Sequence, residues 1–129
     1  MHGERDLNRL LAELDVQRRD GVYTFVTGVW PDLEREAHAT IVEGEGGTYI
    51  VTVDHARRAG APVEFEAAWL TLTVKSSLDA VGLTAAVSGV LADAGIACNM
   101  LSAFHHDHAL VPVRRADEAV RLLRGLSSR

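Results

Sequence analysis

A strand pattern followed by a helix pattern in the second half of the chain constrains the fold most. Between residues 66 and 74, apolar side chains alternate with Trp69, Thr71 and Thr73, a period of two that indicates a strand. Over 83–94 the apolar residues recur at i, i+4, i+7, i+8 and i+11, the stripe of an amphipathic helix. Gly95 is placed to end this helix, with Ile96 making the apolar contact of a left-handed glycine cap.

The rest of the second half predicts a hairpin and a closing helix. We expect strands over 97–104 and 109–113, a turn over 105–108 and a helix over 116–126. The order strand, helix, strand, strand, helix is a βαββαβ unit without its last strand, and the residues after 126 are too few to supply it. Either the first half or a second copy of the molecule must therefore cover that sheet edge.

The first half predicts a related fragment. The charges after Pro31 break the strand pattern, Gly44 to Gly47 is typical of a hairpin loop, Asp54 is a candidate helix cap with Gly60 as the stop, and Pro62 marks the boundary between halves. The expected elements are a helix over 6–14, strands over 22–29, 39–43 and 48–53, and a short helix over 54–59. We therefore divide the chain into residues 1–62 and 63–129.

Composition excludes several classes of function. The chain has 129 residues and a net charge of −5, which suits one compact domain or two very small ones. An acidic, aromatic-poor chain lacks the clustered Lys and Arg that nucleic-acid binding needs. The longest uncharged stretch, 80–92, holds 13 residues, whereas a membrane span needs roughly 20. The charged N-terminus has no signal-peptide core, so we expect a cytoplasmic protein with no membrane partner.

Three segments of the second half resemble the ACT domain family. They are LTLTV at 70–74, SSLDAVGLT at 76–84 and AGIACNM at 94–100, which match the first strand, the glycine-leucine ligand loop and the step into the second strand of that family. YTF at 23–25, VEGEGGT at 42–48 and HHDHALVP at 105–112 look like a family of short bacterial proteins with paired ACT-like modules. The first half matches more loosely, since EAHA at 36–39 replaces the usual basic strand.

The resemblance implies an α+β, ferredoxin-like (βαββαβ) fold of two interlocked halves with antiparallel sheets and helices on one face. Residues 1–62 would be an ACT-like half and residues 63–129 an ACT domain. It also implies a non-catalytic regulatory or sensory protein, a homodimer without a cofactor, that binds a small molecule such as an amino acid. The alternative is a protein-binding adaptor whose ligand site is vestigial.

The loop before the predicted helix has physical reasons to bind a carboxylate. Helix N-terminal N–H groups and the macrodipole favour an anion, Gly82 permits close approach to the backbone, and Ser76, Ser77 and Thr84 add hydroxyl donors. In the alternative reading, Ser77 only caps the helix and Gly82 only relieves packing. Together with the resemblance, these arguments predict one set of ligand-binding residues: Ser76, Ser77, Val81, Gly82, Leu83, Thr84, Asn99 and Asp107.

Two residues of this set come from outside the loop. In a turn, the Asp107 side chain would form a hydrogen bond with its own backbone. The resemblance to arginine-sensing relatives implies instead that Asp107 binds the amino or guanidinium group of a ligand. Asn99 carries a donor and an acceptor that suit an α-amino acid across an interface, or else a bond that fixes the strand edge.

Metal and catalytic readings are weaker. In an extended hairpin His106 and His108 face one way and His105 the other, so we expect a polar turn and no metal site. The lone Cys98 reads as a buried strand residue. Neither a nucleophile elbow nor a histidine-glutamate zinc motif is present, so a small metal-dependent enzyme ranks last and no catalytic residue is assigned.

Overall fold

The computed structural model describes residues 3–128, which divide into two compact units. Unit 1 combines residues 3–19 with 68–128, and unit 2 consists of residues 20–67. Residues 3–19 thus pack with the second half of the sequence, which is the sense in which the two halves interlock. The expected division at 62/63 separates the halves along the sequence, while packing adds the N-terminal segment to the second of them.

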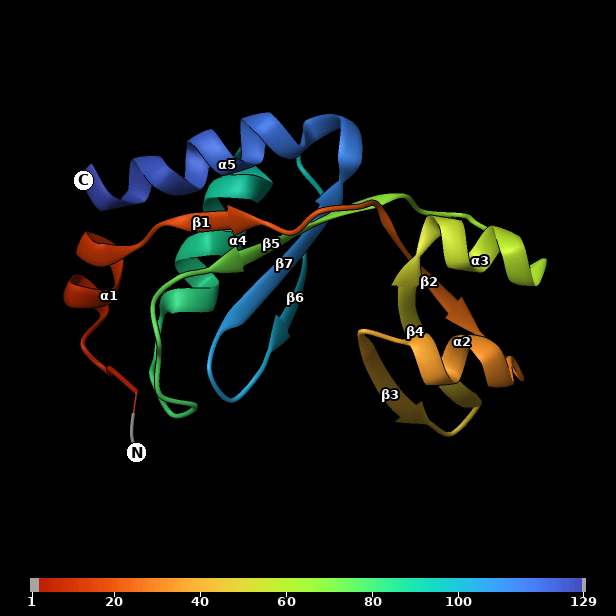
Figure 1. Ribbon diagram of the computed structural model, residues 1–129. Coiled ribbons are helices and arrows are strands. Elements are labelled where there is room, and N and C mark those ends of the chain that lie inside the picture. Colours follow the sequence, from red (N-terminus) through yellow and green to blue (C-terminus); the bar gives the residue numbers. More distant parts are fainter. Residues whose placement is uncertain (1–2, 129) are drawn as a thin grey trace. The chain divides into compact units, whose positions relative to one another are not determined.

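Unit 1 is a four-stranded sheet with helices. The strands lie in the order β1-β5-β7-β6, and β1 pairs antiparallel with β5, as does β6 with β7. Its elements along the chain are α1 (Leu7–Glu13), β1 (Val16–Arg18), β5 (Ala67–Leu72), α4 (Leu83–Asp93), β6 (Asn99–Ser102), β7 (Asp107–Pro112), η1 (Val113–Arg115), α5 (Ala116–Arg124) and η2 (Gly125–Ser128). Figure 1 shows α4 and α5 beside these strands.

Strand β1 supplies the strand that the second half lacks. Its three residues pair with β5 in the register Val16↔Leu72, Gln17↔Thr71 and Arg18↔Leu70, at the sheet position beside β5 that would otherwise be an open edge. Its outer side is also protected, because Nη2 of Arg124 donates to the carbonyl oxygen of Val16 at 3.1 Å. The edge left open by the sequence pattern is thus covered by the first half.

The core of unit 1 joins the N-terminal segment to the sheet and helices. Buried side chains of α1, β1, β5, α4, β7 and α5 form one cluster: Leu10, Leu14, Val16, Ala68, Leu70, Leu72, Val74, Leu83, Val87, Leu91, Ile96, Ala109, Val111, Ala116, Ala119, Leu123 and Leu126. Gly95 has a φ of +71° and Ile96 is buried in this cluster, so the predicted glycine cap of α4 is confirmed.

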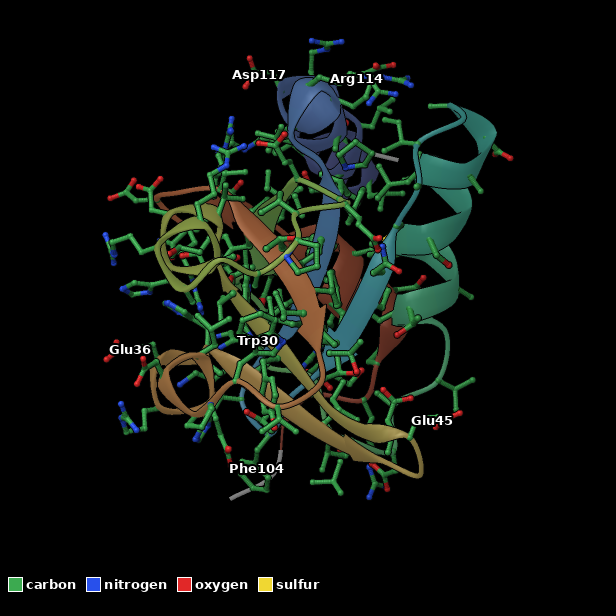
Figure 2. The ribbon with its side chains drawn as sticks, turned by 90° about the vertical axis from the view of Figure 1, so that its right-hand side faces the viewer. Trp30, Glu36, Glu45, Phe104, Arg114 and Asp117 are labelled. Atoms are coloured by element: carbon green, nitrogen blue, oxygen red, sulfur yellow. The ribbon has the colours of Figure 1, made fainter. Side chains whose placement is uncertain are left out.

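Unit 2 has three antiparallel strands and two short helices, drawn at the right of Figure 1. Its elements are β2 (Tyr23–Thr27), α2 (Pro31–Glu36), β3 (Ala39–Glu43), β4 (Gly46–Thr52) and α3 (Val53–Ala59). The strand order is β3-β4-β2, and both helices cover the same face, because Leu33 and Ala56 pack with Val26, Tyr49 and Val51. Glu45 lies at the turn between β3 and β4 (Figure 2).

The structure differs from the local expectations in two places and adds one helix that was not expected. The charged segment after Pro31 forms α2, which has Pro at its first turn, acidic residues there and one buried anchor, Leu33. Helix α3 is capped by the side chain of Thr52, not Asp54. The hairpin turn lies two residues earlier than expected and is closed by the Ala103 N–H bond to the His106 carbonyl, so Asp107 and His108 begin a strand.

The α+β class with antiparallel sheets is confirmed. Over residues 3–128, no helix combines the length and the apolar character needed to cross a bilayer.

Candidate functional site

The predicted ligand loop borders a cavity in unit 1. The cavity has a volume of about 110 Å³ and lies where the loop between β5 and α4 meets the β6–β7 hairpin. Since a water molecule takes about 30 Å³, the space holds three or four waters or the polar end of a small ligand. Its walls are Ser76, Ser77, Leu78, Ala80, Gly82, Leu83, Thr84, Ser102 and Asp107.

Asp107 gives the cavity a nearly buried carboxylate. The residue is 7% exposed, and the hydroxyl of Ser76 donates to Oδ2 at 3.1 Å. An ionised carboxylate accepts about four hydrogen bonds, and a charge removed from water is costly unless it is paired. This wall of the cavity therefore suits a cationic group such as an ammonium or a guanidinium.

The opposite chemistry comes from the start of α4. Gly82 is the N-cap, with a φ of +107° and no side-chain cap hydrogen bond, and the first backbone bond of the helix runs from the Ala86 N–H to the Gly82 carbonyl. The preceding N–H groups of this eleven-residue helix, at Leu83 and Thr84, have no partner within the helix. They and the helix dipole favour a carboxylate.

Most of the predicted residues meet at this cavity. Ser76, Ser77, Gly82, Leu83, Thr84 and Asp107 line it, whereas two do not. Val81 is 83% exposed, and Asn99 is exposed on β6 opposite Leu110.

Ser102 is a wall residue that the sequence prediction missed. It pairs with Asp107 in the β6–β7 register, so both side chains lie on the same side of the hairpin. The spacing between Ser102 and Asp107 would have predicted this pair, but the expected turn over 105–108 included Asp107 and therefore excluded it from the strand.

The alternative in which Ser77 caps the helix is wrong. The Ser77 hydroxyl bonds Asp79, and Asp79 also pairs with Arg5, so neither side chain reaches the helix N–H groups. These bonds hold the pKa of Asp79 below its usual range: the Ser77 hydroxyl contributes most, desolvation opposes it, and the charge of Arg5 adds to the lowering. The loop is shaped by its own side chains.

His108 lies on β7 beside Asp107 and serves another contact. Its Nδ1 accepts from the Trp69 indole N–H at 3.0 Å and lies 3.0 Å from Oγ1 of Thr71. Because an indole can only donate, Nδ1 carries no proton and the ring is neutral. Desolvation, followed by the charge of Arg19, lowers the pKa of His108.

Among residues 3–128, no three His, Cys, Asp or Glu side chains are grouped so that they would hold a metal ion. Cys98 is a half-buried thiol whose pKa is raised by desolvation. Phe104, in the hairpin turn, is 66% exposed (Figure 2).

Comparisons with known proteins identify the family of the chain. Two sequence profiles of the ACT domain match the chain, one over residues 2–68 and the other over residues 64–125. The chain is also 34% identical to VC0802 of Vibrio cholerae, a protein of unknown function described as a possible transport protein, over 94% of this chain and 95% of that one, with a TM-score of 0.83. The chain belongs to the ACT domain family. Among curated proteins, none matches it.

More distant structures share the fold. The regulatory subunit of aspartate kinase from Thermus flavus is 14% identical over 88% of this chain and 95% of its own length, with a TM-score of 0.60. E. coli aspartokinase III, in complex with aspartate and ADP, is 16% identical with a TM-score of 0.60, over 90% of this chain and 33% of the enzyme. The paired ACT modules therefore resemble aspartokinase regulatory domains.

Proposed function

We propose that this chain is a non-catalytic regulatory protein that binds a free amino acid at the cavity of unit 1. The observation that carries the proposal is the nearly buried carboxylate of Asp107 in a cavity that also borders the N-terminus of α4. The first group suits the α-ammonium or a guanidinium, and the second suits the α-carboxylate. An amino acid presents both charges within one small head group.

The comparisons support a regulatory role of this kind. The solved structures of similar fold include a regulatory subunit of aspartate kinase, and an aspartokinase was crystallised with the amino acid aspartate. The proposal carries over the class of ligand and not its identity. The match covers 33% of aspartokinase III, so the proposal takes nothing from the other two thirds of that enzyme.

The proposal is tested by calorimetric titration with each of the twenty amino acids. We expect one or a few to bind, and their N-acetyl and carboxamide derivatives to bind at least tenfold more weakly, because each removes one of the two charges. Asp107→Asn should abolish binding while the protein stays folded. The matched control is Asp93→Asn, an exposed aspartate at the end of α4.

Two results would count against amino-acid binding. If no amino acid binds to well-folded protein, the adaptor with a vestigial site becomes the better account. If Asp93→Asn weakens binding as much as Asp107→Asn, the effect reflects net charge and not the cavity.

The expected homodimer is also part of this proposal, with β3 as its contact. Among residues 3–128, strand β3 has β4 as its one neighbour, at the end of the unit 2 sheet, and it exposes Ile41 by 44% and Val42 by 88%. An apolar edge strand with free backbone groups favours pairing with another chain. Light scattering should give twice the chain mass for the wild type and for Val29→Lys, an equally exposed loop valine, and the monomer mass for Val42→Lys.

A further inference from the structure

We propose that residues 3–7, here called the N-terminal brace, are positioning residues that hold the ligand loop 75–82 in its binding arrangement. The inference rests on the proposed function and adds a means of control to it. The brace lies beside the loop in unit 1 (Figure 1), and it contacts the loop in three ways: through backbone hydrogen bonds, an ion pair and an apolar contact.

The backbone contact pins the start of the loop. The Glu4 N–H donates to the Lys75 carbonyl at 2.8 Å, and the Ser77 N–H donates to the Glu4 carbonyl at 2.9 Å, which makes a parallel bridge between Glu4 and Ser76. Gly3 lies so close that a Cβ there would stand 2.5 Å from the carbonyl carbon of Ser76. Only glycine fits this approach without a backbone shift.

The ion pair pins the middle of the loop. The Arg5 guanidinium meets both carboxylate oxygens of Asp79, with Nε 3.0 Å from Oδ1 and Nη2 2.7 Å from Oδ2. This fork geometry is directional, although both side chains are more than half exposed and salt will weaken the pair. Asp79 in turn bonds Ser77, so the pair is linked to a cavity residue.

The apolar contact pins the end of the loop. A Cβ built on Gly82 would stand 2.8 Å from Cδ2 of Leu7, so the space that a side chain would take at position 82 is filled from α1. Because Gly82 has no side chain, Leu7 of the brace can pack against it. The positive φ is a second reason for glycine at this position.

The loop is thus held from one side by the brace and faces the cavity with the other. Ser76, Ser77 and Gly82 each contact the brace and also line the cavity, where the Ser76 hydroxyl bonds Asp107. The ligand needs this arrangement of the loop, and the brace stabilises the same arrangement. Brace contact and ligand binding must therefore strengthen each other, because each raises the fraction of molecules in the shared state. Release of the brace therefore weakens ligand binding.

The test uses Gly3→Ala, which blocks the close approach to Ser76, and Gly44→Ala, a glycine with open space around it, as the matched control. The first readout is hydrogen exchange of the Glu4 and Ser77 amides. The second is calorimetric titration with the amino acid that binds the wild type. We expect Gly3→Ala to speed both amides and to raise the Kd about tenfold, as for a binding-competent fraction of about one tenth. Gly44→Ala should change neither readout.

A second pair of variants separates positioning from general stability. Arg5→Ala should weaken binding and speed amide exchange at Ser77. Arg5→Lys keeps the charge, so its ligand affinity and its Ser77 exchange rate should both return toward the wild-type values. Amide exchange in β4 should be unchanged in all variants. The proposal is overturned if the brace amides exchange freely in the wild type, or if Gly3→Ala frees them without changing the Kd. If the wild type binds none of the twenty amino acids, the proposed function fails and the positioning role fails with it.

Discussion

The indole Nε1–H of Trp69 donates a hydrogen bond to Nδ1 of His108 across 3.0 Å, and the two rings meet edge to face with centroids 5.5 Å apart. The contact joins β5 to β7 and fixes the histidine in its neutral form. Arg19 stacks on the same indole, with its guanidinium carbon 3.9 Å from the ring centroid, so a cation already stands beside the pair. Protonation of His108 would break the hydrogen bond and place a second cation there.

We therefore predict that acidification destabilises the protein in part through His108. Its pKa in the folded protein lies below the usual value of 6.5, so between these two values the unfolded chain binds more protons and the unfolding free energy rises with pH. The stabilisation is present above pH 6.5 and is lost as the pH falls through the folded pKa. Urea unfolding at pH 7.5 and 5.0 should show a smaller pH dependence for His108→Phe than for the wild type.

An NMR titration checks the same contact directly. The chemical shift of the Trp69 indole N–H should change as the pH passes through the pKa of His108. A His108 ring that titrates at or above 6.5, or an equal pH dependence of stability in His108→Phe, would contradict this assignment.

The N-terminal segment is predicted to be part of the core of unit 1. Leu10 of α1 is 2% exposed within that cluster, and β1 closes the sheet edge. Leu10→Ala should lower the unfolding free energy by about 2–5 kcal/mol, the range for truncating a buried leucine. Val29→Ala removes a side chain that is 90% exposed and should change it by less than about 0.5 kcal/mol. Urea denaturation measures both, and equal small effects would show that the segment is a dispensable tail.

Periodic segments of the fold were predictable from the sequence. The alternation in β5, the apolar stripe of α4 and the glycine stop after it require many residues to agree, so chance is a poor explanation for them. The segments that escaped prediction lack such a pattern. Helix α2 has a single buried side chain, Leu33, and β1 has three residues with only Val16 buried, so tertiary contacts decide both.

The candidate site shows the same division. The loop at 76–84 was predictable because its residue types and its place before a helix have a chemical meaning. Ser102 lines the cavity because the strand register places it opposite Asp107. The sequence analysis placed the hairpin turn two residues too late, so this pairing was not predicted. The brace could not be predicted, since contacts such as that between Leu7 and Gly82 join segments 75 residues apart and leave no local pattern.

The hydrogen bond between Ser76 and Asp107 yields the last prediction, which concerns the stability of the ligand-free protein and its ability to bind an amino acid. Asp107 is nearly buried and needs partners, so Ser76→Ala should lower the unfolding free energy of the ligand-free protein by about 1–3 kcal/mol. Asp107→Leu removes the charge and should raise that free energy while abolishing amino-acid binding, as expected where a site is kept for function at a cost in stability.

In the double variant, Ser76→Ala should then cost almost nothing, because the group it left unsatisfied is gone. Urea denaturation of the four proteins of this cycle measures the coupling between the two side chains. If Ser76→Ala costs the same with and without the carboxylate, the hydroxyl does not support Asp107.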